Sequence, residues 1–259
     1  MTLRATLSTA EGKRRYVRRL FATIADRYDF ITGFLSYGQD RRWKARLIAL
    51  ADIRDGDDVL DLACGTGDLA FAALARTKTA VALDVTHRML QLARKRAHAD
   101  DGVGPADRPE KLAPRWVNGD MLALPFSDAR FDVVTTGYGL RNVPDLRQAV
   151  REMRRVLRPG GRLLSLDFNR PDNPLVRSAY LAYLTAVGSA LGIVLHRDPD
   201  TYRYIPESIR QYPGAREVAR LLDAEGFDDV QVVPLLGGLM AIHVARSAQP
   251  NARATAQER

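Results

Sequence analysis

Short apolar segments rich in Val and Leu alternate with longer amphipathic segments along most of the chain. This alternation is typical of βα units stacked into a mostly parallel sheet. We therefore predict an α/β fold, with a seven-stranded, mostly parallel sheet and helices on both faces. The predicted strands are residues 58–63, 80–84, 114–118, 131–136, 162–168, 230–235 and 240–245. The clearest predicted helices are residues 68–76, 86–99, 145–157 and 215–225.

Turn-forming and polar residues set the limits of this core. Arg-Pro-Gly-Gly at residues 158–161 predicts a turn that ends a helix and leads into the next strand. We expect one domain over residues 55–246, preceded by a helical N-terminal extension over residues 1–54. A polar loop at residues 100–112 and an insertion at about residues 169–213 interrupt it, and residues 247–259 predict a disordered tail.

Composition adds a bias towards anionic partners. The 259 residues carry a formal net charge of +8, and Lys and Arg exceed the acids in the first fifty residues. Anionic membranes or nucleic acid would attract such a chain, although a basic, solvated helix face explains the same pattern. We find no secretory signal, and Cys64 is a single cysteine, so cytoplasmic localisation is expected. Cys64 is interpreted as a packing residue.

A glycine loop follows the first strand and opens the first core helix. Gly65 and Gly67 let backbone approach a ligand, and the helix N-terminus offers free N–H groups. The segment also satisfies the dinucleotide pattern G-x-G-x-x-A, so an NAD-binding site is an alternative. Asp68 would repel a pyrophosphate at this point. S-adenosylmethionine has no phosphate, and its ammonium and sulfonium would be stabilised by Asp61 and Asp68.

Two further strand ends complete the predicted cofactor site. Asp84 can accept both ribose hydroxyls, a need that both cofactors share. Asp120 can accept from an adenine amino group while Met121 packs on the ring, and this segment resembles the adenine-side motif of class I methyltransferases. A single such acid is more often an N-cap or surface carboxylate, but four acids at strand ends favour the cofactor site.

Several segments outside this core resemble the ubiquinone and menaquinone biosynthesis C-methyltransferases. They are Ala-Asp-Arg-Tyr-Asp at 25–29, Leu-Ser-Tyr-Gly at 35–38, Arg-Trp-Lys at 42–44, Gly-Leu-Arg-Asn-Val at 139–143, the segment 155–161, Asp-Thr-Tyr-Arg-Tyr at 200–204 and Glu-Ser-Ile-Arg at 207–210. The chain departs from the family at Ile31-Thr32 (usually Met-Asn), at Asp40 (usually His) and at residues 167–169 (usually Glu-x-Ser). These departures leave the quinol head group open.

The resemblance implies a Rossmann-like class I methyltransferase fold and S-adenosylmethionine as cofactor. It implies that Thr66, Asp84, Asp120 and Met121 contact the cofactor and that Gly137 stands where the family often has a serine. It also implies a substrate site that includes Tyr28, Arg141, Asn142, Tyr202 and Arg203. No metal site is expected.

A hypothesis for the mechanism follows from the acceptor chemistry. A phenol with a pKa near 10 is ionised to only about one part in a thousand at neutral pH. Arg141 is the candidate that stabilises the phenolate, and Tyr28 relays or orients the proton. The alternative is that Arg141 is a structural ion-pair partner. His196 is a weaker candidate for the base.

Residues 178–195 contain no charged side chain and predict a lid helix within the insertion. Such a lid would cover a polyprenyl tail and rest on an anionic membrane surface, whereas packing on the core or a homodimer interface are the alternatives. The favoured function is C-methylation of demethylmenaquinol. Methylation of 2-methoxy-6-polyprenyl-1,4-benzoquinol or of another small lipophilic acceptor is the alternative. Nucleic-acid binding is not expected, because aromatic residues do not interleave with the basic clusters.

Overall fold

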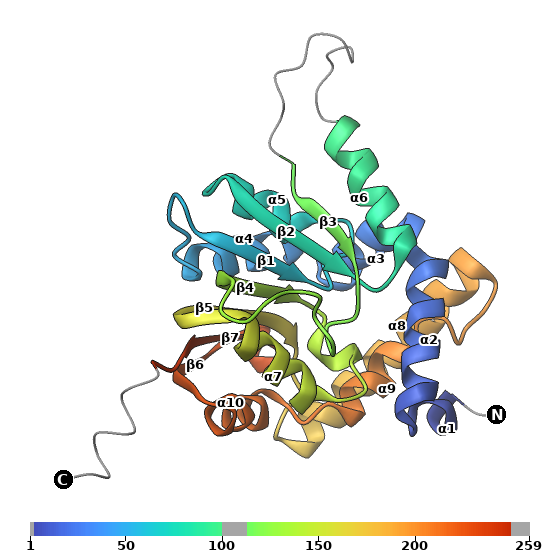
Figure 1. Cartoon of the computed structure of the whole chain (residues 1–259). Helices are drawn as coiled ribbons and strands as arrows, with labels where there is room; N and C mark the ends of the chain where they lie inside the picture. Colours follow the sequence, from blue (N-terminus) through green and yellow to red (C-terminus); the bar gives the residue numbers. More distant parts are fainter. Residues whose placement is uncertain (1–2, 100–112, 250–259) are drawn as a thin grey trace.

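A seven-stranded sheet in the order β3-β2-β1-β4-β5-β7-β6 forms the centre of the molecule (Figure 1). The computed structural model describes residues 3–99 and 113–249. Within them β7 runs antiparallel to β5 and β6, and the other neighbouring strands are parallel, which confirms the predicted fold class. The strands are β1 (Asp58–Leu62), β2 (Thr79–Asp84), β3 (Arg115–Asn118), β4 (Phe131–Gly137), β5 (Leu157–Phe168), β6 (Phe227–Leu235) and β7 (Met240–Ser247).

One predicted turn lies inside a strand. Leu157 pairs with Phe131 and Arg162 pairs with Val133, so β5 has three more residues than β4 between these pairs. The prediction of a turn outside the strand at residues 158–161 is therefore wrong. The extra residues form a bulge, with Gly160 in the left-handed region at φ +75°. β5 therefore begins at Leu157, before the predicted strand 162–168, because Leu157 pairs with Phe131 of β4.

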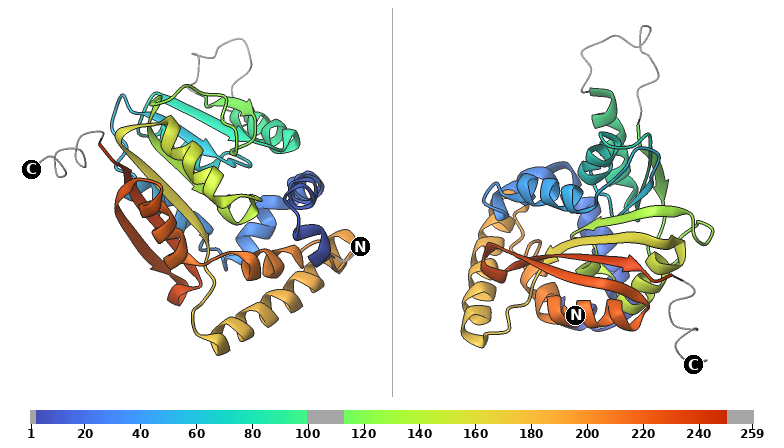
Figure 2. Two further views of the ribbon diagram at one scale, coloured as in Figure 1. Left: turned by 60° about the horizontal axis from the view of Figure 1, so that its bottom comes forward. Right: turned by 90° about the vertical axis from the view of Figure 1, so that its left-hand side faces the viewer.

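Helices cover both faces of the sheet (Figure 2). One face buries apolar residues of α7 and α10, and the other buries residues of α4 and α5. The helices are α1 (Leu3–Leu7), α2 (Ala10–Ile24), α3 (Tyr28–Leu35), α4 (Asp40–Leu50), α5 (Asp68–Leu74), α6 (His87–Ala99), α7 (Leu146–Val156), α8 (Pro174–His196), α9 (Tyr204–Gln211) and α10 (Ala215–Ala224), with short 3-10 turns η1 (Ala25–Arg27), η2 (Leu140–Asn142) and η3 (Leu236–Gly238).

The N-terminal extension divides into two parts. Trp43, Leu47 and Ile48 of α4 are buried in the same cluster as Val59 of β1 and Leu164 of β5. α4 therefore packs as part of the sheet's own core. The preceding helices α2 and α3 pack instead with residues of the insertion, in a separate apolar cluster.

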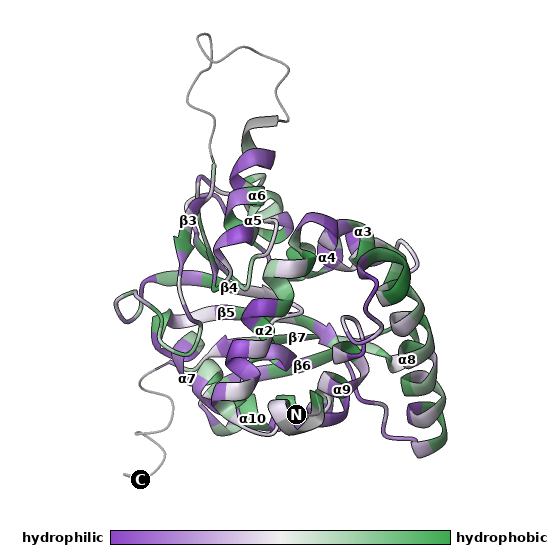
Figure 3. Cartoon of the chain, turned by 90° about the vertical axis from the view of Figure 1, so that its right-hand side faces the viewer, coloured by the Kyte–Doolittle hydropathy of each residue, from purple (hydrophilic) through white to green (hydrophobic). Residues whose placement is uncertain are grey.

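The insertion contributes α8 and α9, so the predicted lid helix exists and is longer than residues 178–195. Asn173 caps α8, since its side chain accepts from Leu175 N at 2.9 Å. Figures 1 and 3 show that α2, α3, α8 and α9 lie at the end of the sheet where β1 and β4 end. The predicted loop at residues 100–112 and residues 250–259 of the predicted tail lie outside the described residues.

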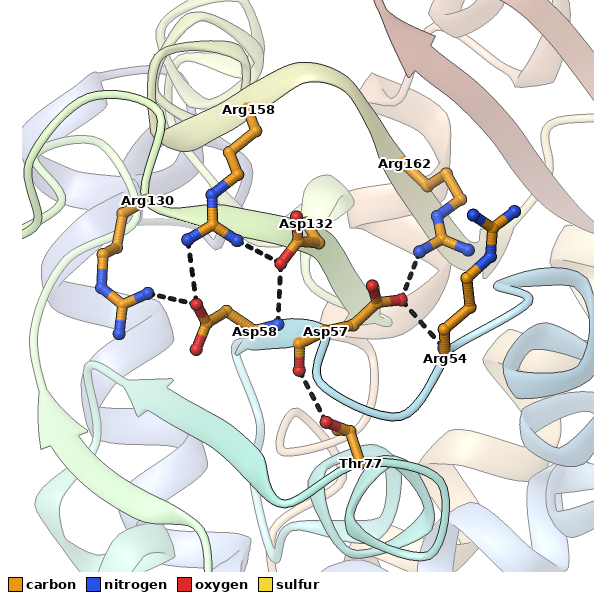
Figure 4. Close-up of polar contacts among 8 residues, drawn as sticks. All are labelled: Arg54, Asp57, Asp58, Thr77, Arg130, Asp132, Arg158 and Arg162. Atoms are coloured by element: carbon orange, nitrogen blue, oxygen red, sulfur yellow. Dashed lines mark hydrogen bonds and ion pairs between the residues drawn. The ribbon is translucent and has the colours of Figure 1, made fainter.

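Ion pairs join the strands at the opposite end of the sheet, where β1 and β4 begin (Figure 4). Asp132 at the start of β4 accepts from the backbone N–H of Asp58 at 2.9 Å and from the guanidinium of Arg158. Asp58 in turn pairs with Arg130 at 2.5 Å and with Arg158 at 3.0 Å. Arg158 lies in the bulge, so these pairs link it to the starts of β1 and β4.

We predict that Asp132→Asn lowers the free energy of unfolding at pH 7 by about 1–2 kcal/mol, since it weakens bonds to a charged, partly buried acceptor. Hydrogen bonds and charge from Arg158, although opposed by burial, hold the pKa of Asp132 below its usual range. Its contribution is therefore present above the unfolded pKa, about 3.9, and is lost as pH falls through the folded pKa. Urea unfolding at pH 7 and pH 3 measures this.

Asp229→Asn is the matched control, because its carboxylate is exposed and lies 3.9 Å from Arg246. It should change stability little at either pH. An Asp132→Asn defect that is as large at pH 3 as at pH 7 would contradict the electrostatic explanation.

Candidate active site

Asp84 ties the glycine loop to the end of β2. Its Oδ2 accepts from Gly65 N at 2.9 Å, and its Oδ1 accepts from Thr86 N at 2.7 Å. Each carboxylate oxygen keeps a further lone pair, so two ribose hydroxyls can still donate to it. Burial raises the pKa of this carboxyl group, and the two backbone N–H groups oppose that rise. Asp84 therefore both builds the loop and offers acceptors at the cavity wall.

The two predicted glycines of the loop have different roles. Gly65 lines the cofactor cavity, with φ +55° and Tyr28 as the nearest neighbour of an added Cβ at 3.7 Å. Gly67 caps α5 at φ +92°, and a Cβ there would lie 2.7 Å from the ring of Trp116. Gly67 is outside the cavity lining, so the structure explains it by backbone conformation and packing.

Asp61 and Asp68 differ in how their charge is compensated. Asp68 lies between Lys44 at 2.7 Å and Arg96 at 2.5 Å, so two cations neutralise it. Asp61 is almost fully buried and accepts from Thr135 Oγ1 at 2.9 Å through Oδ1. Its Oδ2 has no hydrogen-bond partner among the described residues. Burial raises the pKa of Asp61 to about 7.

A cationic group fits beside Asp61. The carboxyl group lines a small cavity at the glycine loop, together with Gly65, Thr66 and Gly137. A buried carboxylate oxygen without a partner is costly, and an ammonium next to it would supply the missing donor. Of the predicted acids, Asp61 therefore best fits the ammonium of S-adenosylmethionine.

The adenine-side residues line a cavity of about 90 Å³ next to this loop. Asp120 accepts from Leu122 N at 2.9 Å and pairs with Arg14 of α2 at 3.3 Å. Met121 is buried, as the prediction of packing on a ring requires. Gly137 forms part of the wall, and an added Cβ would meet Leu69 at 3.2 Å.

Thr66 contacts α3 as well as the loop. Its hydroxyl donates to Asp29 Oδ1 at 2.7 Å. Asp29 follows Tyr28 in the Tyr-Asp motif, so this bond ties the motif to the predicted methionine end of the site.

A larger cavity of about 450 Å³ adjoins the cofactor cavity. Tyr28 and Tyr138 line both, so the two spaces meet at these rings. The walls of the larger cavity are apolar and aromatic, and they come from α2, α3, α4, β5, α8 and α9. Its lining includes Leu20, Phe21, Ile24, Ile31, Thr32, Trp43, Phe168, Tyr180, Tyr202 and Tyr204. We call it the acceptor cavity.

Arg141 is the cation in the wall of the acceptor cavity. It is 6% exposed, and its Nε lies 3.0 Å from Asp167 Oδ1. Its Nη1 donates to Asn142 Oδ1 at 2.9 Å and approaches Ser208 Oγ at 3.4 Å. Its Nη2 makes no hydrogen bond or ion pair to the described residues. Arg141 is therefore both a structural ion-pair partner and a donor with capacity left for a ligand.

Tyr28 lies at the meeting point of the cofactor and acceptor cavities. Burial raises the pKa of its hydroxyl, although the charges of Lys44 and Arg141 oppose the rise. Tyr28 therefore stays protonated at neutral pH and can donate or pass on a proton, which restricts the predicted relay role.

The structure separates the other predicted substrate residues. Tyr202 lines the acceptor cavity, and its hydroxyl lies 2.8 Å from His196 Nε2. His196 does not line the cavity. Its contact with Tyr202 instead holds the C-terminal end of α8. Asn142 lines the cofactor cavity and accepts from Tyr204 at 2.9 Å. Arg203 is exposed and pairs with Asp200 at 2.8 Å, outside both linings.

Sequence reasoning missed several residues of the site. Tyr138 has φ +60°, donates to Asp40 at 2.6 Å and separates the two cavities. Phe21 of α2 lines both cavities. The amphipathic pattern of this helix predicts an apolar face but not that Phe21 lines a ligand site. Lys44 belongs to the Arg-Trp-Lys motif and pairs at 2.7 Å with Asp40, one turn earlier in α4, but only the fold brings it to Asp68, also at 2.7 Å.

Cys64 and the arrangement of acidic and histidine side chains bear on two other chemistries, a cysteine nucleophile and a metal site. Cys64 is buried, and burial raises the pKa of its thiol well above the usual value, so it is a packing residue as predicted. In residues 3–99 and 113–249, no group of three or more His, Cys, Asp or Glu side chains is placed to hold a metal ion.

Comparison with known proteins gives one family. The model of the ubiE/COQ5 methyltransferase family matches residues 9–247. A protein of Paracoccus denitrificans named ubiquinone/menaquinone biosynthesis C-methyltransferase UbiE is 39% identical over 235 residues, which are 90% of this chain and 91% of that protein. The protein of the same name from Francisella tularensis subsp. novicida is 35% identical over 237 residues, 90% of this chain and 92% of its own.

Solved structures support the fold. A SAM-dependent methyltransferase of Thermotoga maritima is similar with a TM-score of 0.61 and 17% identity, over 89% of this chain and 99% of that one. A SAM-dependent methyltransferase of Aquifex aeolicus gives a TM-score of 0.54 and 16% identity, over 79% and 89%. The fold is therefore that of class I methyltransferases, and S-adenosylmethionine is the cofactor.

We predict that affinity for S-adenosylmethionine rises between pH 6 and about pH 7.5 and falls at higher pH, where the α-ammonium of the cofactor loses its proton. The carboxyl group of Asp61 must be ionised to pair with the cofactor ammonium, and its pKa without ligand is about 7. Asp61→Asn should weaken binding and remove the rise. Calorimetric titrations at pH 6, 7 and 8 measure both effects.

S-adenosylhomocysteine should show the same pH dependence, because it keeps the ammonium and lacks the sulfonium. Asp132→Asn is the control variant, since Asp132 lies at the opposite edge of the sheet. A rise that survives in Asp61→Asn would assign it to another group.

Proposed function

The chain belongs to the ubiE/COQ5 methyltransferase family, and from this premise we propose that it methylates a ring carbon of a prenylated quinol. The observation that carries the proposal is the apolar acceptor cavity of about 450 Å³, which meets the cofactor cavity at Tyr28 and Tyr138 and has Arg141 in its wall. Its volume and aromatic lining suit a flat, hydrophobic ring with a few polar groups.

The favoured acceptor is demethylmenaquinol, which would place the chain in menaquinone biosynthesis. Trp43, Phe168 and Tyr180 give the cavity wide aromatic walls, which favour a fused bicyclic ring. The alternatives are 2-methoxy-6-polyprenyl-1,4-benzoquinol and another small lipophilic acceptor. The acceptor cavity is lined by Ile31, Thr32 and Phe168, which lie in the segments that depart from the family pattern. We infer that these side chains select the quinol head group.

Mass spectrometry of the quinones in cells that lack the gene distinguishes these acceptors. Accumulation of demethylmenaquinone supports the favoured acceptor, and accumulation of the unmethylated benzoquinone supports the first alternative. Restoration by the wild-type gene is the control. An unchanged quinone profile would contradict both quinol assignments and leave the other lipophilic acceptors.

S-adenosylmethionine supplies an electrophilic methyl group on a sulfonium. The protein has to hold the acceptor carbon in line with that methyl group and to favour loss of the neighbouring hydroxyl proton, and positioning alone can remove several kcal/mol of the barrier. Arg141 stabilises the phenolate through Nη2, and Tyr28 holds a proton at the meeting point of the cavities. Apolar walls exclude water, which strengthens the charge interaction.

We predict that Arg141→Met lowers kcat by about 100-fold, which is typical for loss of a donor to a developing oxyanion. The dissociation constant for S-adenosylmethionine should change little, because Arg141 lies in the wall of the acceptor cavity. Steady-state kinetics and cofactor titration measure the two quantities.

A double variant controls for structural damage. Arg141→Met leaves the buried Asp167 without its cation, so stability should fall. Arg141→Met with Asp167→Asn removes both charges and should recover part of that stability without recovering kcat. If the double variant recovers kcat as well, Arg141 has only the structural role.

The surface around α8 supports contact with a lipid bilayer. Among the described residues, α8 is the helix long and apolar enough to cross a membrane by length and composition, and it lies at the edge of the molecule in Figure 3. Leu175 and Val194 of α8 are 80% and 77% exposed, and Phe30 and Phe34 of α3 are also exposed. Val176, Tyr183 and Tyr37 are exposed and also line the acceptor cavity, so its mouth opens among apolar side chains.

We propose that this surface rests on the anionic face of a membrane, from which the quinol enters, and that the exposed arginines of α2 strengthen the attraction. Cosedimentation with anionic liposomes at low salt should show binding. Leu175→Glu with Val194→Glu should abolish most of it, because both changes bring charge into the contact. Val232→Glu on β6 is the control, since it exposes a similar charge elsewhere. Wild-type protein that stays in the supernatant would contradict the membrane contact.

A further inference from the structure

Tyr138 is held in an unusual backbone conformation where the cofactor and acceptor cavities meet. Its φ of +60° lies in the left-handed region, which bulky residues rarely adopt. Its N–H donates to Leu166 O at 2.7 Å, and its carbonyl accepts from Asn142 Nδ2 at 2.6 Å. A strained conformation persists only where its surroundings fix it, and such residues cluster at ligand sites. These bonds therefore fix where the ring of Tyr138 points.

The hydroxyl end of Tyr138 lies on the acceptor side. Its oxygen is 2.6 Å from Oδ1 of the buried Asp40, at the start of α4. Ser36 and Trp43, which stand on either side of Asp40 in the chain, line the acceptor cavity together with Tyr138. A polar group of a ligand in this cavity can therefore come within hydrogen-bond distance of the Tyr138 oxygen.

The neighbours of Asp40 fix the direction of the hydrogen bond from Tyr138. Lys44 Nζ lies 2.7 Å from Asp40 Oδ2, and an ammonium can only donate. Asp40 therefore accepts on both oxygens, and Tyr138 gives its one hydroxyl hydrogen to Oδ1. Burial is the main cause that raises the pKa of Tyr138 well above its usual value, and the charge of Asp40 adds to the rise, so this hydrogen stays in place. The Tyr138 oxygen can accept from a ligand but has no hydrogen left to donate.

Arg141 supplies a donor next to the same aromatic neighbour. The rings of Tyr138 and Phe168 have centroids 5.8 Å apart, and Arg141 Cζ lies 4.8 Å from the centroid of Phe168. All three side chains line the acceptor cavity. A flat ring that packs on Phe168 therefore meets one group that only accepts and one group that only donates.

A group that only accepts distinguishes the two redox forms of a quinone. The reduced ring carries hydroxyl groups, which can donate to Tyr138, whereas the oxidised ring carries carbonyl oxygens, which cannot. The oxidised ring would place two acceptors against each other in an apolar cavity, and both would lack a donor. A site built to bond a hydroxyl group rejects an analogue without one.

We propose that Tyr138, oriented by Asp40, selects the reduced, hydroxyl-bearing form of the acceptor ring over its oxidised form. Tyr138 makes the contact with the ring, and Asp40 is a positioning residue that acts through Tyr138. The inference rests on the proposed function, since it requires a quinol as the acceptor, and it adds the group that recognises the redox state of that quinol.

The midpoint potential of a bound quinone measures this selection. The probe is 2,3-dimethyl-1,4-naphthoquinone, whose positions 2 and 3 are already methylated, so no methyl transfer accompanies the measurement. Each tenfold preference for the reduced form raises the two-electron potential by about 30 mV. We expect Tyr138→Phe to lose about a tenfold preference, so its bound potential at pH 7 should lie about 30 mV below that of wild type. Anaerobic redox titration with protein in excess measures it.

Asp40→Asn tests the orientation of the hydroxyl group. Lys44 can only donate, so it keeps the oxygen of the new amide, and the amide NH₂ then donates to Tyr138. The hydroxyl hydrogen of Tyr138 is released and can donate to a carbonyl. The bound potential should therefore fall at least as far as in Tyr138→Phe. Tyr138→Phe with Asp40→Asn should equal Tyr138→Phe alone, because Asp40 acts through the Tyr138 hydroxyl.

Tyr212→Phe is the matched control, because this buried tyrosine lies outside the linings of both cavities. It should leave the bound potential unchanged. Both redox forms bind to the same variant, so a general loss of structure weakens both and leaves their ratio, and hence the potential, as it was.

The inference is overturned if Tyr138→Phe or Asp40→Asn keeps the wild-type potential. The same comparison is made with 2,3-dimethoxy-5,6-dimethyl-1,4-benzoquinone, so that the result does not depend on the choice of head group. If the wild type binds neither ring in either redox form, the proposed function fails and the inference fails with it. Binding without a redox preference that depends on Tyr138 removes the inference alone.

Discussion

The site depends on one carboxylate that holds two backbone segments together. Asp84 receives N–H groups from Gly65 in the loop after β1 and from Thr86 after β2. These bonds fix the glycine loop against the end of the neighbouring strand, and they fix the ribose-binding oxygens with it. Because the strand order changes direction between β1 and β4, the loops after these strands diverge and leave room beside the carboxylate.

The cofactor side and the acceptor side come from different parts of the chain. The cofactor side is made mainly by loops of the sheet, whose geometry follows from the strands. The acceptor cavity is closed by α2, α3, α8 and α9, which lie outside the repeating βα units. Tyr28 and Tyr138 join the two sides, one from each source. A change in the outer helices can therefore alter the acceptor while the cofactor side stays the same.

The fold could be predicted from the sequence because apolar runs and turn signals mark each strand. The limits of β5 could not be predicted. Residues 158–161 have the composition of a turn, but they form a bulge inside the strand, after the pair of Leu157 with Phe131. The positions of Asp61, Asp84 and Asp120 at one end of the sheet could be predicted, because these residues lie at or just after the ends of β1, β2 and β3. The pairing of Asp68 with Lys44 and Arg96 could not be predicted, because those cations come from α4 and α6 and meet Asp68 only in the folded chain. Tyr138 was missed for the same reason.

The ion pairs around Asp132 lie at the other end of the strands from the candidate active site. Rigidity at one end of a strand limits how far its other end can move sideways, even when the outer helices shift. The ion pairs of Arg130 and Arg158 with Asp58 and Asp132 thus hold the starts of β1, β4 and β5 together by charge as well as by backbone hydrogen bonds.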